Sequence, residues 1–146
     1  MPKFEREVEI DAPVEKVWSV IIDPKQWKQW LPGIDDDANV TTTQADASIE
    51  WMSGEKKGRA SIAQSEPMKR LEILTEIGDD KDSHVFKLRP SGGFFGLSED
   101  ECKVEYTFDT LMGGGILGNF IAGGNPKDAL RVKKAMNLLR KLVESL

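Results

Sequence analysis

Alternation of apolar and polar positions predicts strands over much of the chain. Residues 3–10 (KFEREVEI) place glutamates on one face and mainly apolar residues on the other. A period of two residues indicates a β-strand with one wet face. Similar segments predict six further strands, and short connections between them favour an antiparallel meander. These strands are expected at residues 39–44, 47–54, 57–66, 69–78, 83–90 and 101–112.

Two short helices are predicted directly after the first strand. Apolar residues recur at helical spacing over 14–22, and Pro13 suits a first helical turn, where its missing N–H needs no partner. Asp23 and Pro24 repeat this start signal for a second short helix. The Pro-Gly pair at 32–33 ends it.

A long amphipathic helix is predicted to follow the last strand. Asn125 and Pro126 form its start signal, and an apolar stripe then runs to about residue 145. Such a helix is about 30 Å long at 1.5 Å per residue, which matches the length of the longer predicted strands. The order strand, two helices, six strands, helix predicts one α+β domain over residues 1–146.

Charge and composition limit the classes of partner and the location. The net charge is −5, and nucleic-acid binding depends on cationic residues, so we expect no nucleic-acid partner. No apolar run reaches the ~20 residues that a bilayer span needs, so we expect no transmembrane segment. The start of the sequence lacks the apolar region of a secretory signal. The single cysteine, Cys102, fits a reducing compartment, and these features together predict a cytoplasmic protein.

Side chains suited to catalysis are few. His84 is the only histidine, which excludes a site with two histidine ligands. We expect it to be exposed, because it begins a predicted strand beside a polar turn. Arg6, Lys87 and Arg89 share the parity of apolar neighbours, so one of them could hold an acid group, but solvent-facing positions are the better expectation. We therefore expect no catalytic residue, no metal and no cofactor.

The segment IDAPVEKVWSVIIDPKQWKQW (residues 10–30) carries a resemblance to a known family. Its pattern Ile-x-Ala-Pro-x-Glu-x-Val-Trp, followed by Asp-Pro and Trp-x-x-Trp, resembles the START-related polyketide cyclase/dehydrase and lipid-transport superfamily (SRPBCC). Gly58, Pro67 and the glycine-rich stretch 113–124 extend this resemblance over nearly the whole chain. The matching residues of the segment are Ile10, Ala12, Pro13, Glu15, Val17, Trp18, Asp23, Pro24, Trp27 and Trp30.

The resemblance implies the helix-grip architecture of the birch-pollen-allergen-like fold. A seven-stranded antiparallel sheet would curl around the long C-terminal helix, and the two short helices would close one end. Proteins that share this fold usually hold an apolar small molecule or lipid between sheet and helix. We therefore expect binding of a hydrophobic or aromatic small molecule or a lipid. The alternatives are a cyclase- or hydrolase-like enzyme and a chaperone-activator-like protein-interaction domain.

Aromatic and apolar residues are the candidate walls of such a cavity. Trp18 lies in the apolar stripe of the first helix, which indicates a core position. Trp27 and Trp30 either wedge the second helix against the sheet or line the mouth of the cavity. The loops 91–100 and 113–124 are either packed segments, a gate, or a surface for a protein partner. The predicted ligand-binding residues are Trp27, Trp30, Trp51, Phe86, Leu88, Phe94, Phe95, Tyr106, Phe108, Met112, Leu117, Phe120, Met136 and Leu139.

Overall fold

The strands and helices follow one another in the predicted order. The computed structural model of the chain describes residues 3–32, 34, 39–43, 48–53, 55–92, 98–112 and 126–146. The elements are β1 (Lys3–Ile10), α1 (Val14–Ile21), the 3-10 turn η1 (Pro24–Gln26), α2 (Trp27–Trp30), β2 (Thr41–Thr43), β3 (Ser48–Ser53), β4 (Lys56–Glu66), β5 (Arg70–Ile77), β6 (Asp80–Gly92), β7 (Ser98–Met112) and α4 (Pro126–Ser145).

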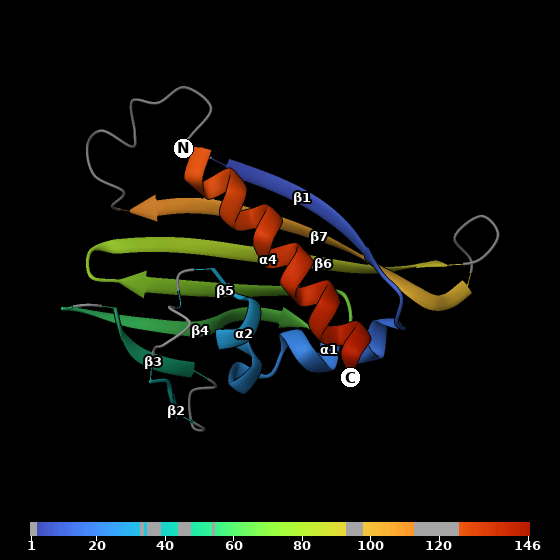
Figure 1. Cartoon of the computed structure of the whole chain (residues 1–146), viewed down its shortest axis with the longest axis horizontal. Helices are drawn as coiled ribbons and strands as arrows, with labels where there is room; N and C mark the ends of the chain where they lie inside the picture. Colours follow the sequence, from blue (N-terminus) through green and yellow to red (C-terminus); the bar gives the residue numbers. More distant parts are fainter. Residues whose placement is uncertain are drawn as a thin grey trace.

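The strands form one seven-stranded antiparallel sheet in the order β1-β7-β6-β5-β4-β3-β2 (Figure 1). From β2 to β7 each strand pairs with the next along the chain, whereas β1 pairs with β7. The α+β class, with an antiparallel sheet and a C-terminal helix, is thereby confirmed.

The hairpin between β5 and β6 is tighter than its sequence predicts. The polar run 78–82 suggests a turn of five residues, but β6 already begins at Asp80, which pairs with Ile77. Gly78 makes this two-residue connection possible because its φ of 60° is a conformation that favours glycine. As a result, residues near the predicted start of β6 lie well inside the strand.

The long helix α4 crosses one face of the sheet, with β1 along one side, α2 beside its middle and α1 near its C-terminal end (Figure 1). Its buried side chains are Val132, Ala135, Met136, Leu139 and Val143. The second predicted helix is divided into η1 and the single turn α2. Asp23 caps this start as predicted, because its carboxylate accepts a hydrogen bond of 3.1 Å from the Lys25 N–H.

Side-chain alternation gives the sheet one buried face and one charged face. The buried residues of β3 to β7 join the apolar stripe of α4 in a single core cluster, and we call their side of the sheet the inner face. The outer face carries ion pairs such as Lys103 with Glu7 and Glu9. Arg6, Lys87 and Arg89 are exposed, which agrees with the preferred expectation that they face solvent.

Candidate ligand-binding site

Most of the residues predicted to line a cavity are buried together on the inner face. Trp27, Trp30, Trp51, Phe86, Leu88, Tyr106, Phe108, Met136 and Leu139 all belong to the core cluster. Phe94, Phe95, Leu117 and Phe120 lie outside the described residues, and so does the side chain of Met112. The loop 113–124 is likewise not described, and the loop 91–100 is described only at its ends.

A continuous row of aromatic rings extends from α2 across the inner face. Trp30 meets Phe86 edge to face, with ring centroids 5.2 Å apart, and Phe86 stacks on Tyr106 at 4.5 Å. His84 continues the row, stacked near Tyr106 and edge-on to Phe108. Stacked and edge-to-face pairs are the favourable arrangements of aromatic quadrupoles, so these contacts stabilise the row within the core.

The two tryptophans of α2 have different surroundings. The Trp27 indole N–H donates a 2.8 Å hydrogen bond to the carbonyl oxygen of Ile21, which fastens α2 to the end of α1. Trp30 is equally buried, but its indole nitrogen has no hydrogen-bond partner among the described residues. Trp27 is therefore a wedge between helices, whereas Trp30 keeps a buried donor available.

Trp51, on β3, also has a buried indole nitrogen without a partner among the described residues. The residue is 3% exposed. Its ring lies directly over Gly58 on β4, where an added Cβ would be 2.4 Å from Cε2 and 2.6 Å from Nε1. Glycine is required at this position because the indole occupies the space of a side chain.

His84 is buried at the centre of the inner face, and the expectation that it is exposed is wrong. Its ring lies between two hydroxyl groups: Nε2 is 2.8 Å from Thr75 Oγ1, and Nδ1 is 2.5 Å from Tyr106 Oη. The early start of β6 explains the error, because it moves His84 away from the turn. The parity shared with Phe86 and Leu88 was the sequence signal that could have revealed it.

The buried chain Thr75–His84–Tyr106 is electrically neutral at neutral pH. Burial lowers the pKa of His84 from 6.5 to about 3, because the charged imidazolium would lose its hydration. A neutral imidazole has one donor and one acceptor nitrogen. One hydroxyl therefore donates to His84 and the other accepts from it, in either of two directions.

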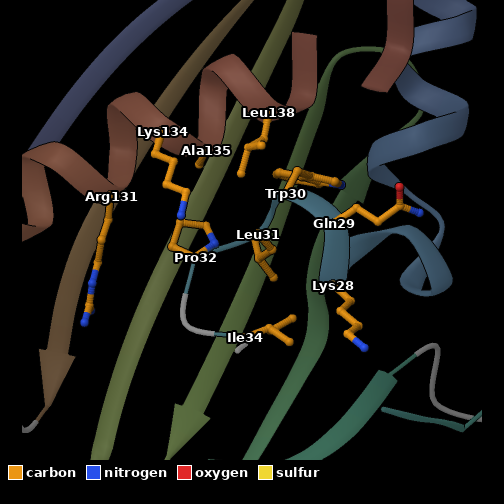
Figure 2. Close-up of a pocket in the computed structure, with 10 residues that line it drawn as sticks. All are labelled: Lys28, Gln29, Trp30, Leu31, Pro32, Ile34, Arg131, Lys134, Ala135 and Leu138. Carbon is orange, nitrogen blue, oxygen red and sulfur yellow. The ribbon is translucent and has the colours of Figure 1, made fainter. Parts of the chain in front are cut away.

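A small pocket lies where α2 meets α4 (Figure 2). Its volume is about 130 Å³, roughly four times the share of one water in the liquid. Trp30 forms part of its wall and links it to the aromatic row, while Lys28, Arg131 and Lys134 extend around its rim. The remaining lining residues are Gln29, Leu31, Pro32, Ile34, Ala135 and Leu138. Drug-sized ligands occupy pockets of at least about 300 Å³, so this pocket alone is too small to hold one.

Two further properties concern metals and membranes. Over the described ranges, no three histidine, cysteine, aspartate or glutamate side chains are grouped as a metal site requires. None of the helices within these ranges combines the length and the apolar character that a bilayer crossing demands.

Solved structures with the same fold come from several bacteria. Protein TTHA0849 from Thermus thermophilus has a TM-score of 0.70 and 18% identity, with coverage of 99% of this chain and 98% of that one. Protein CV1439 from Chromobacterium violaceum has a TM-score of 0.66 and 16% identity, with coverage of 99% of both chains. DynU16, from the dynemicin biosynthetic locus, has a TM-score of 0.63 and 18% identity, and the match covers 99% of this chain and 48% of DynU16.

At these identities the structures show the fold alone. No curated protein matches the chain. The family described as polyketide cyclase / dehydrase and lipid transport matches residues 1–144, almost the whole sequence. The chain therefore belongs to the polyketide cyclase/dehydrase and lipid-transport family of the SRPBCC superfamily.

Proposed function

We propose that the protein binds a hydrophobic or aromatic small molecule, or a lipid, between the sheet and α4, which grip it as in other helix-grip proteins. The observation that carries this proposal is the pair of buried, unpartnered indole N–H groups of Trp30 and Trp51 among the described residues. A buried donor without an acceptor costs about 1–3 kcal/mol. A ligand that supplies acceptors and apolar surface would remove this cost.

The proposed ligand contacts are those predicted from the sequence. The aromatic row would offer apolar area and ring faces to the ligand. The pocket between α2 and α4 would give the ligand an entry next to Trp30. Phe94, Phe95, Met112, Leu117 and Phe120 remain predicted contacts. We also propose a cytoplasmic location, which rests on the composition, and the loops 91–100 and 113–124 remain the predicted surface for a protein partner.

The low pKa of His84 favours binding over proton transfer. General acid–base catalysis is most effective when the pKa of the catalytic group lies near the working pH. Burial holds the pKa of His84 at about 3, so its imidazole is a weak base at neutral pH. Such a neutral ring is better suited to hydrogen bonding with a ligand than to the proton transfer of a cyclase or hydrolase reaction.

Native mass spectrometry of the purified protein tests the proposal. We expect a bound apolar molecule that is retained under gentle ionisation and released on denaturation. The apo protein should then bind members of a panel of fatty acids, sterols and polyaromatic compounds, with quenching of tryptophan fluorescence. An apo mass throughout, with no change of mass or fluorescence for any compound of the panel, would contradict the proposal.

A further inference from the structure

A second pocket lies at one end of the sheet, between the first turn of α1, the turn that joins β4 to β5, and the region near the end of β6. We call it the end pocket. Its volume is about 460 Å³, within the range of about 300–1,000 Å³ that is typical of small-molecule sites. Among the described residues it shares no lining residue with the pocket between α2 and α4. Most of its wall is apolar, and the apolar lining residues are Val14, Pro67, Met68, Leu88 and Pro90.

Met68 holds an unfavourable backbone conformation at the wall of the end pocket. The Lys69 N–H donates a 3.0 Å hydrogen bond to the Glu66 carbonyl oxygen, which closes a turn with Pro67 and Met68 at its centre. The φ of Met68 is 61°, and this conformation at the second central position of a turn favours glycine or asparagine. Met68 is also 43% exposed, so burial in the core does not explain the methionine. Backbone strain is often retained at binding sites, which indicates a role for the side chain itself.

The side chains of the wall favour an aromatic ligand over a saturated one. Methionine is flexible and polarisable, so Met68 can adapt to the shape of a ligand, and its sulfur makes favourable contacts with aromatic rings. Lys69 and Arg89 add cations to the lining, and a cation can pack against the face of a ring. A saturated hydrocarbon of the same size would bury the same apolar area but would gain neither attraction.

Charges of both signs around the end pocket disfavour a charged ligand. Glu15, on α1, lines the pocket together with Lys69 and Arg89. Arg89 Nη2 lies 3.9 Å from a carboxylate oxygen of Glu105, so part of its charge is already balanced. An anion or a cation would therefore meet a like charge as well as an opposite one, and it would lose hydration on entry. An uncharged molecule avoids both costs.

We infer that the end pocket is a second binding site, which takes a compact, uncharged aromatic molecule such as naphthalene. Met68 forms the adaptable part of its wall, and Val14 and Leu88, which belong to the core cluster, form its floor. This inference goes beyond the proposed function. Of the ligand contacts predicted from the sequence, only Leu88 lines the end pocket within the described ranges, so the two sites can be occupied and tested separately.

Four probes separate aromatic character from size and charge. They are naphthalene, its saturated counterpart decalin, the anion 2-naphthoate and the cation 2-naphthylmethylammonium. Binding is followed by NMR through methionine methyl groups labelled with ¹³C. Met68 reports on the end pocket, whereas Met136, buried on the inner face, reports on the site between the sheet and α4. We expect naphthalene to shift the Met68 signal with an affinity about fivefold higher than that of decalin, and to bind more tightly than either ion.

Two substitutions test the roles of individual residues. Met68→Asn removes the thioether but suits the left-handed backbone, so we expect an unchanged or higher unfolding midpoint in urea and an affinity for naphthalene reduced about fivefold. The matched control is Met52→Asn, which should leave the affinity unchanged, because Met52 is also exposed but does not line the end pocket. Glu15→Gln should raise the affinity for 2-naphthoate about threefold and leave that for naphthalene unchanged.

A Met68 signal that stays in place with every probe would overturn the inference. Equal affinities of naphthalene and decalin, tightest binding of an ion, or undiminished naphthalene affinity in Met68→Asn would overturn it as well. Each of these results leaves the proposed function standing, because that function is tested by native mass spectrometry and its own panel of compounds. A shift of the Met136 signal alone would place the ligand on the inner face and exclude the end pocket.

Discussion

The two faces of the sheet hold polar groups in opposite ways. On the outer face, Lys103 Nζ lies 3.8 Å from a Glu7 carboxylate and 3.9 Å from that of Glu9, and both glutamates are more than half exposed. On the inner face, Thr75, His84 and Tyr106 are buried and neutral, and their contacts are shorter. Water competes with the first arrangement and not with the second. The neutral chain should therefore contribute more to stability than the charged groups.

Removal of the imidazole should have the largest effect. His84→Ala leaves a cavity and two buried hydroxyl groups that have lost a partner. We expect the free energy of unfolding to fall by about 4 kcal/mol, measured by urea denaturation at neutral pH. A loss below about 1 kcal/mol would show that the hydrogen bonds of His84 to Thr75 and Tyr106 do not form as described.

Lowering the pH should reduce the free energy of unfolding by a comparable amount. The unfolded imidazole gains a proton below pH 6.5, whereas burial lowers the pKa of the folded one and keeps it neutral until about pH 3. The contribution of the buried, neutral His84 to the free energy of unfolding is complete above pH 6.5. It is lost as the pH falls, because the unfolded state then binds one more proton than the folded state. At about 1.4 kcal/mol per pH unit, the loss reaches about 3 kcal/mol at about pH 4.

His84→Ala provides the control for this pH effect, because other groups also titrate in acid. The stability difference between wild type and variant should shrink steadily as the pH falls from 6.5 toward about 4. Parallel curves of the free energy of unfolding against pH for the two proteins would show that folding does not lower the pKa of His84.

A methyl group at Gly58 should disturb the inner face to a smaller extent. Gly58→Ala would place a Cβ within 2.4 Å of the Trp51 ring, so the indole must move. We expect a loss of about 2 kcal/mol together with a shift of tryptophan fluorescence. In a Trp51→Ala background, the same substitution should cost almost nothing, and an unchanged cost there would exclude the contact as the cause.

Loss of the outer-face cation should have the smallest effect. Lys103→Ala is expected to lower the free energy of unfolding by no more than about 0.5 kcal/mol, because exposed ion pairs are screened by water and salt. A loss above about 2 kcal/mol, eliminated by high salt, would remove the contrast between the two faces.

Periodicity predicts the elements of this fold well but predicts contacts poorly. The strands and the stripe of α4 follow directly from side-chain alternation and helical spacing. Burial of His84 was missed because a single glycine shortens the preceding turn. The difference between Trp27 and Trp30 could not be predicted at all, since it depends on which carbonyl group lies within reach of each indole. The place of Trp51 over Gly58 depends in the same way on strand register.

The pairing of β1 with β7 has a consequence for the order of folding. Lys3 pairs with Asp109, so the edge of the sheet is completed by residues separated by most of the chain. During synthesis, β1 emerges first but has no partner until β7 has left the ribosome. Closing such a long loop before its contacts form makes this step slow. Until then the apolar side chains of β1 lack the sheet partner that buries them, so the inner core is completed only when β7 joins the sheet.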